Sequence, residues 1–160
     1  MLGEVVMSVE LPKQAEFEVI KEEFGEYRLE DGTRIRARVF LADLYIIGED
    51  AIGPQIAYQV AVALRFIVPE EIRVKVKEKP IADRVDPKNP GWRRLKIECV
   101  KPAESHYIID DRYELVLRLE LLGAAKNDNY RTPLYTPHYQ VRWTTVASIE
   151  PREDRQEKST

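Results

Sequence analysis

The chain has 160 residues, 44% hydrophobic and 33% charged, so it can bury a core as one ordinary domain or two small ones. Its net charge of −3 argues against a general binder of polyanions, which is usually basic, but leaves room for a local basic patch. The single cysteine, Cys99, excludes an internal disulfide and a cysteine-based zinc site. Its apolar neighbours predict a buried, inert thiol.

No basic and apolar leader is recognised at the start of the sequence, and the most apolar stretch, residues 51–68, is interrupted by Pro54 and Arg65. We therefore expect a cytoplasmic protein that does not enter a membrane. The many charged residues and the few Asn, Gln, Cys and Met residues are typical of thermophilic proteins.

Two short strands are predicted before the first hairpin. Residues 5–9 alternate apolar and polar side chains and precede Pro12, and residues 16–21 form the second candidate. Both stretches fit strands that direct one face at a core.

Residues 26–41 predict a β-hairpin whose turn contains Asp31 and Gly32. A two-residue loop would place Leu29 opposite Arg34 and mix core with solvent. A three-residue loop that ends at Gly32 avoids this, because a shift of one residue moves every side chain to the other face. The predicted buried face consists of Tyr27, Leu29, Ile35, Ala37 and Val39, and the predicted wet face of Arg28, Arg34, Arg36 and Arg38.

The apolar stretch at residues 56–68 fits a helix that begins near Pro54 and fits a strand equally well. A similar stretch at residues 139–149 is rich in alternating β-branched residues, which favours a strand in both places. Residues 72–76 alternate apolar and basic side chains and predict one more strand.

The segment 80–94 contains three prolines and a glycine and predicts a linker. We therefore predict a first β unit at residues 1–79, a second β unit at residues 95–151, and a frayed tail at residues 152–160.

A second hairpin at residues 107–122 resembles the first when the chain is shifted by 80 positions. Under this shift Glu18, Lys21, Tyr27, Asp31, Arg38 and Leu41 fall on Glu98, Lys101, Tyr107, Asp111, Arg118 and Leu121. About one or two identities are expected by chance. If one residue is inserted in the second half, the match continues further along the chain, and residues 58–60 fall on residues 139–141. The shift predicts an internal duplication, and the alternative is two unrelated β-meanders that share a period of two.

These elements predict an all-β protein. We expect two tandem, small units of β-barrel or sandwich type, which an internal duplication would relate and which share a core. Duplicated units often replace the two subunits of an ancestral homodimer, so an extended surface shared between the two units is expected.

Arg34, Arg36 and Arg38 lie about 7 Å apart on one face of a predicted strand. They could line a groove for phosphates, with Tyr45, Arg93 and Arg94 as further contributors. The alternative is a solvated face that pairs with Glu26 and Glu30. The second half does not repeat this arginine stripe.

Residues 126–139 are predicted as a long loop rich in tyrosine, arginine and amides, and such loops often bind a partner. The candidate binding residues are Asn127, Asp128, Tyr130, Arg131, Tyr135 and His138. The alternative is a hairpin connection whose tyrosines pack on the end of a sheet. Trp92 and Trp143 are predicted to lie in the core or to plug the ends of the barrel.

The sequence contains none of the common nucleotide-binding or nucleophile motifs, which disfavours catalysis. The single conceivable metal set is His106, Asp110, Asp111, Asp128 and His138. The two histidines lack a metal-binding spacing, and Asp110-Asp111 is explained by turn formation, so no metal site and no cofactor are expected.

The leading hypothesis is a non-catalytic binding or assembly module that acts through loops and sheet edges on a protein partner or on a second copy of itself. One alternative is a nucleic-acid-binding β-domain that uses the arginine strand. Another is a metal-dependent enzyme centred on His106 and His138.

Overall fold

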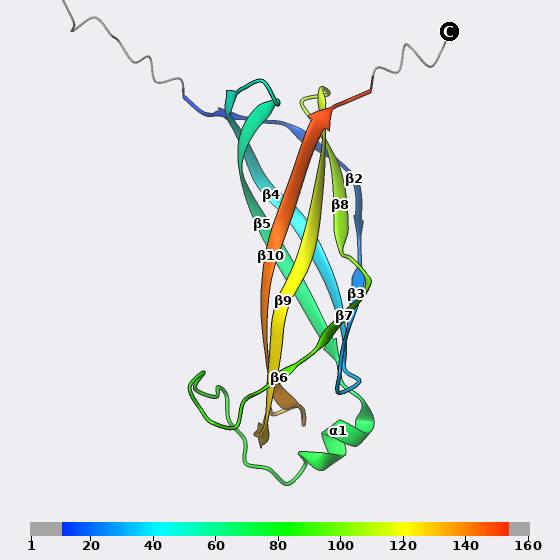
Figure 1. Cartoon of the computed structure of the whole chain (residues 1–160), viewed down its shortest axis with the longest axis vertical. Coiled ribbons are helices and arrows are strands. Elements are labelled where there is room, and N and C mark those ends of the chain that lie inside the picture. The colour runs from blue at the N-terminus through cyan, green and yellow to red at the C-terminus, as the bar shows by residue number, and fades with distance from the viewer. Residues whose placement is uncertain (1–10, 154–160) are drawn as a thin grey trace, which may run out of the picture.

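The computed structural model describes residues 11–153, which form ten strands and one short helix (Figure 1). The strands are β1 (Lys13–Gln14), β2 (Phe17–Glu23), β3 (Gly25–Leu29), β4 (Arg34–Glu49), β5 (Pro54–Ile67), β6 (Arg93–Leu95), β7 (Ile97–Lys101), β8 (Glu104–Ile109), β9 (Tyr113–Arg131) and β10 (Pro137–Pro151), and the helix is α1 (Glu70–Lys75). The all-β prediction is confirmed. The predicted strand at residues 5–9 lies outside the described residues, as do residues 154–160 of the tail predicted at residues 152–160.

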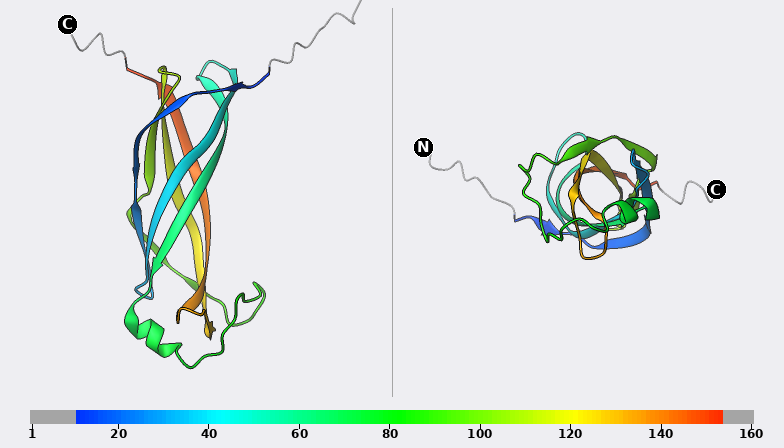
Figure 2. Two further views of the ribbon diagram at one scale, coloured as in Figure 1. Left: turned by 180° about the vertical axis from the view of Figure 1, so that it is seen from behind. Right: turned by 90° about the horizontal axis from the view of Figure 1, so that it is seen from below.

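The strands form two five-stranded antiparallel sheets that pack together. One sheet, called sheet A, contains β1, β3, β4, β5 and β7, and the other, sheet B, contains β2, β6, β8, β9 and β10. The two long hairpins β4–β5 and β9–β10 run the length of the molecule, and the sheets wrap around one core (Figures 1 and 2). Within residues 11–153 neither sheet closes on itself, since β5 pairs with β4 alone and β10 with β9 alone.

The two sheets exchange strands where the chain bends. Phe24 alone separates β2 in sheet B from β3 in sheet A, and Pro102 and Ala103 separate β7 in sheet A from β8 in sheet B. The bent strand β2–β3 pairs along its length with the bent strand β7–β8. Each sheet therefore combines strands from both predicted units, and the buried residues of both form one cluster.

The first hairpin has the predicted register. The N–H of Leu29 donates to the carbonyl of Thr33 at 2.8 Å, so the loop has three residues. Gly32 closes it with a φ of 95°, which favours glycine. The predicted inward side chains, including Tyr27 and Ile35, are buried.

Strand pairing in the second half repeats that in the first with an offset of 80 residues. The pair Phe17↔Ile109 of β2 and β8, with each residue moved by 80, becomes the pair Ile97↔Leu29 of β7 and β3. The ladders β3–β4 and β8–β9 are related in the same way, as are the ladders β1–β4 and β6–β9. The correspondence thus extends over tertiary pairing as well as over similar residues.

The long hairpins also share a β-bulge, at Ala42 in β4 and at Leu122 in β9. After this bulge the register corrects the extended sequence match. Tyr58 lies opposite Leu44 in the first hairpin, and the corresponding residue of the second hairpin, opposite Ala124, is Val141 rather than Tyr139. The offset on the last strand is therefore 83, because three more residues separate Lys126 from its partner Tyr139 than separate Ile46 from its partner Ile56.

The predicted strand at residues 72–76 is wrong, because these residues belong to or follow α1. Glu70 and Glu71 follow Pro69 and complement the first turn of the helix. Ile72 and Val76, four residues apart, are buried on one face, whereas Val74 is 60% exposed. The alternation in sequence was compatible with both periods, and burial of one helical face decided between them. Within residues 11–153 no helix is long enough to cross a membrane.

Two predictions of burial are also wrong. Cys99 is exposed, because it lies on β7, the outermost strand on its side of sheet A. Trp143 is 40% exposed, because it lies on β10, which has a neighbour on one side only. In both cases an apolar sequence context did not reveal which strands would be at the margin of a sheet.

Two buried tyrosines connect the halves. The hydroxyl of Tyr27 donates to the carbonyl of Leu119 at 2.6 Å and accepts from the N–H of Ala103 at 3.0 Å. Its counterpart Tyr107 accepts from the N–H of Leu41 at 2.8 Å. Burial, followed by its hydrogen bond to a glutamate, raises the pKa of Tyr107 to about 12. Both hydroxyls therefore satisfy backbone groups of the opposite half.

We expect Tyr27→Phe to lower the free energy of unfolding by about 2 kcal/mol, because it leaves a buried N–H and a buried carbonyl without this partner. Urea unfolding measures the change. Tyr45→Phe is the matched control, since no hydrogen bond of its hydroxyl occurs within the described part of the chain, and it is expected to change stability by less than about 0.5 kcal/mol. Equal effects of the two substitutions would contradict this role for Tyr27.

Candidate functional site

The free edge of β5 is the first candidate. The carbonyl of Val39 on β4 accepts a hydrogen bond from Ser105 Oγ at 2.6 Å, so Val39 directs its backbone groups away from β5. In an antiparallel ladder, two opposed residues that exchange no hydrogen bonds both point their N–H and C=O outward. Val62 lies opposite Val39 and therefore presents its backbone groups to the free edge.

The free edge of β10 is built in the same way. The N–H of Leu119 on β9 donates to the carbonyl of Ala103 at 3.0 Å, away from β10. Thr145 lies opposite Leu119, so its backbone groups point to the free edge. At their lower ends the two edge strands contact through stacked rings of Phe66 and Tyr139, whose centroids lie 5.3 Å apart.

The β5 edge carries few features that prevent association. It is 14 residues long, and Arg65 is its one charged residue. The side chains that point inward are half-buried, and those that point outward are mostly exposed alanines and glutamines. Natural proteins usually protect such edges with charges, prolines, bulges or a covering segment. A long, nearly uncharged edge is thus a surface suited to pairing with another strand.

The residues predicted as a binding loop lie mainly on strands. The strand β9 continues to Arg131 and β10 begins at Pro137, so the connection covers residues 132–136 alone. Of the six predicted residues, Asn127, Asp128, Tyr130 and Arg131 lie on β9, Tyr135 lies in the turn and His138 lies on β10. The loop prediction is wrong because polar residues at the end of β9 pair with the segment that follows α1, which makes a polar strand stable there.

Several of these residues have structural partners. Asn127 is fully buried and donates to Asn89 Oδ1 at 3.1 Å. Arg131 lies over the ring of Tyr135 at 4.2 Å from its centroid. Asp128 pairs with Arg93 at 3.7 Å on the surface. These contacts join β9 to Asn89, to β6 and to the turn, and the role of the residues in binding stays a prediction.

A buried polar cluster lies beside them at the lower end of the molecule. Lys126 Nζ lies 3.1 Å from Asp31 Oδ2, and the two side chains are 6% and 7% exposed. The hydroxyl of Tyr139 donates to the same oxygen at 2.8 Å, and the N–H of Thr33 donates to Asp31 Oδ1 at 2.9 Å. The cluster therefore ties the turn of the first hairpin to β9 and β10.

The surroundings perturb two groups in this cluster. Burial, the largest single effect, raises the pKa of Asp31, but the hydrogen bonds from Thr33, Tyr139 and Lys126 outweigh it and hold the pKa below its usual value. Burial, with the nearby Asp31 carboxylate, raises the pKa of Tyr139. At neutral pH the cluster therefore holds a carboxylate surrounded by hydrogen-bond donors.

The arginine stripe on β4 is largely occupied by contacts within the protein. Arg34 pairs with Glu26 at 3.0 Å, as the alternative interpretation predicted. Arg36 and Arg38 both lie over the ring of Phe24, at 4.6 and 4.8 Å from its centroid. The ion pair offsets the charge of Arg34, and the ring of Phe24 attracts the guanidinium groups of Arg36 and Arg38 to the protein surface. Arg93 and Arg94 lie on β6 in the other sheet and do not extend the stripe.

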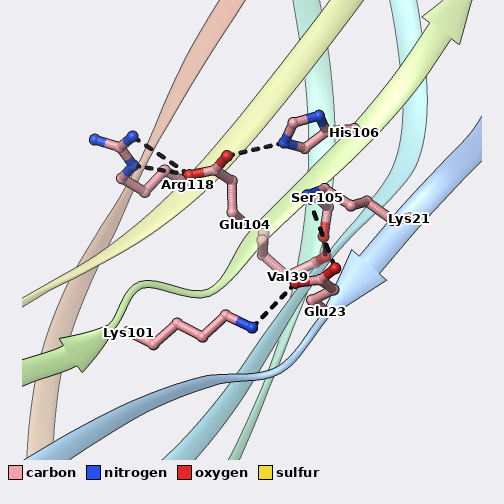
Figure 3. A network of polar contacts seen from close by, with 8 residues as sticks. All are labelled: Lys21, Glu23, Val39, Lys101, Glu104, Ser105, His106 and Arg118. Carbon is pink, nitrogen blue, oxygen red and sulfur yellow. Dashed lines mark hydrogen bonds and ion pairs between the residues drawn. The ribbon is translucent and has the colours of Figure 1, made fainter.

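A surface network surrounds the point where the sheets exchange strands (Figure 3). Glu104 lies between His106 and Arg118, with contacts of 2.8 and 3.3 Å. The hydrogen bond from His106, followed by that from Arg118, holds the pKa of Glu104 below its usual value. Glu23 pairs with Lys101 at 3.1 Å on the neighbouring strands. The network therefore consists of ion pairs between strands and a hydrogen bond within β8.

The five candidate metal ligands are not gathered at one place. Within residues 11–153 no group of three or more His, Cys, Asp or Glu side chains is arranged to hold a metal ion. Asp110 and Asp111 form the β8–β9 turn with φ values of 49° and 58°, in agreement with turn formation. His106 lies on β8 and His138 on β10.

The cluster of Asp31, Lys126 and Tyr139 was not predicted from the sequence. Asp31 and Lys126 are 95 residues apart, so no local spacing could associate them. The one signal was that Asp31 occupies a turn in which its carboxylate can accept from the N–H two residues later.

No known protein family, curated protein or solved structure matches this chain.

Proposed function

We propose that this protein is a non-catalytic assembly module that pairs with a second copy of itself along β5. The supporting observation is the 14-residue free edge with a single charged residue. An unpaired edge with this composition is a template for another strand. Pairing would place its backbone donors and acceptors in a continuous sheet that spans two molecules.

The distribution of charge on β5 favours a second copy as the partner. A twofold axis would bring two β5 strands together in antiparallel orientation. Arg65 lies near the end of the strand, so in a pair centred on Val60 or Ala61 the two arginines lie about 30 Å apart. The centre of the pair would consist of alanine and valine, which fit closely without repulsion.

We further propose that the two halves arose by duplication of one β unit. The ladders β2–β8 and β3–β7 share one register, as do the ladders β3–β4 and β8–β9. These common registers and the shared bulge support this origin. Under this proposal the free edges of β5 and β10 are equivalent positions that have since diverged. The β10 edge carries more charge, with Arg142 and Glu150, and is the less suited to self-pairing.

Size-exclusion chromatography with light scattering tests the assembly. At micromolar concentration the expected mass is twice the 18.6 kDa of one chain. Ala61→Lys is expected to raise the dimer dissociation constant at least tenfold, because it places like charges opposite each other across the pair. Val62→Pro is expected to have a similar effect, since it removes a donor that faces the edge without removing a bond to β4.

Ala51→Lys is the matched control, because it adds the same charge in the exposed β4–β5 turn beyond the ladder. It is expected to leave the dimer intact. Circular dichroism verifies that each variant is folded. A wild-type protein that stays monomeric across the micromolar range would refute self-assembly, and a dimer that survives both β5 substitutions would refute the assignment to this edge.

A further inference from the structure

The lower part of sheet B has a hollow on its outer face. Three strands lie side by side there, with β9 between β6 and β10. Across them Arg94, Ala125 and Gln140 form one row, and Gly123 lies opposite Arg142 in the next. The central strand β9 contributes only the small residues Gly123 and Ala125 to these rows. The longer side chains of Arg94, Gln140 and Arg142 on the flanking strands therefore project beyond them and leave a hollow over β9.

This hollow is an open pocket of about 320 Å³, which lies within the size range of small-molecule sites. Its lining consists of Arg94, Leu122, Gly123, Ala124, Ala125, Gln140 and Arg142. Neither arginine forms an ion pair or a hydrogen bond with its side chain within the described part of the chain. By contrast, Arg34 and Arg118 on the outer faces of the sheets pair with glutamates.

The first half contains the same arrangement of strands with different side chains. By strand register, Gln14, Tyr45 and Ala57 form the row that corresponds to Arg94, Ala125 and Gln140. Asp43 and Gln59 correspond to Gly123 and Arg142. The half-buried Tyr45 thus occupies the place that Ala125 leaves open.

Charge differs between the two halves as strongly as volume does. In the first half Gln14 Nε2 donates to Asp43 Oδ1 at 3.2 Å, so the carboxylate has a partner. In the second half the carboxylate is replaced by Gly123, and two neutral glutamines are replaced by Arg94 and Arg142. The second half thus lacks the tyrosine ring and the negative charge of the first half, and it has two additional positive charges. These differences together provide room for a ligand at this position and favour an anionic one.

We propose that this pocket binds a phosphate group through Arg94 and Arg142, with Gln140 as a further donor. Guanidinium groups match the oxygens of a phosphate with paired hydrogen bonds, and two of them balance its double charge. The pocket has room for more than the bare ion, so the ligand can be inorganic phosphate or a small phosphate ester. This site does not involve the β5 edge and does not depend on self-assembly.

NMR titration of the full chain with inorganic phosphate and with ribose 5-phosphate, at constant ionic strength, tests the site. We expect saturable shifts at Gly123 and Ala125 with both probes. Tighter binding of ribose 5-phosphate would assign the site to an ester, and tighter binding of inorganic phosphate would assign it to the free ion. Arg94→Ala and Arg142→Ala should each weaken binding at least tenfold.

Ala125→Tyr tests the hollow itself, because it restores the side chain that the first half carries at the corresponding position. It should abolish binding while both arginines are retained. Arg28→Ala is the control for charge, since Arg28 is exposed on β3 in the other sheet. Absence of saturable binding at millimolar phosphate, or an equal loss with Arg28→Ala, would overturn the proposal.

Discussion

Asp31→Asn is expected to lower the free energy of unfolding by about 3 kcal/mol or more, because it leaves the Lys126 ammonium buried without a counter-charge. The asparagine keeps an oxygen for the N–H of Thr33, so the substitution mainly removes charge. Urea unfolding measures the loss. The effect is large because the two partners come from the turn of one hairpin and from the long strand of the other.

Two further variants identify the cause. Lys126→Met added to Asp31→Asn removes both charges, and the double variant is expected to be more stable than Asp31→Asn alone. Glu26→Gln breaks the exposed pair with Arg34 in the same hairpin and is expected to cost less than about 1 kcal/mol. If Asp31→Asn costs no more than Glu26→Gln, the buried pair has no special role.

The same pair determines a dependence on pH. The folded protein holds the pKa of Asp31 below its unfolded value, so ionised Asp31 contributes stability above that unfolded value, about 4. The contribution is lost as the pH falls through the lower, folded pKa. Stability of the wild type should therefore decline more steeply below about pH 4 than that of Asp31→Asn. Parallel curves would contradict the role of Asp31.

Gly25→Ala is expected to prevent folding or to destabilise the protein by more than about 4 kcal/mol. A Cβ atom on Gly25 would lie 2.1 Å from the backbone nitrogen of Ala103 and 2.5 Å from its Cα. The clash is with backbone rather than with a flexible side chain. It occurs where β2–β3 and β7–β8 bend from one sheet to the other, so neither strand can move without disturbing both sheets.

Soluble expression and thermal unfolding measure this effect. Gly123→Ala is the matched control, because a Cβ there has no atom within 4 Å. It is expected to leave stability unchanged or to raise it by about 0.4–1 kcal/mol through the smaller entropy of the unfolded chain. A soluble Gly25→Ala protein with an unchanged melting temperature would show that the strands are not fixed at this point.

The proposed assembly edge and the proposed phosphate pocket lie in different halves of the molecule. In the first half, Tyr45 and Asp43 occupy the positions that correspond to Ala125 and Gly123 of the pocket, and β5 forms the nearly uncharged edge. The second half has the open pocket and the more charged edge. Because the strands of both halves pair in the same register, these differences can be assigned to individual side chains.

Local sequence patterns determined several features of this protein. The alternation around Asp31 and Gly32 predicted both the loop length and the buried face of the first hairpin, because a shift of one residue would have exposed its apolar side chains. The alternating β-branched residues at 139–149 predicted the strand character of the similar stretch that forms β5. The offset of 80 residues anticipated the repeated register of the ladders β2–β8 and β3–β7, whereas the last strand follows an offset of 83.

Tertiary structure decided the rest. Residues 70–75 form a helix and not a strand because one helical face of that segment is buried. Cys99 and Trp143 are exposed because their strands lie at the margins of the sheets. Asp31 and Lys126 are far apart in the chain and form a buried ion pair, and Arg94 and Arg142 line one pocket because β9 lies between β6 and β10. Spacing along a chain carries information about neighbours within a hairpin, whereas contacts between hairpins depend on how the sheets exchange strands and pack.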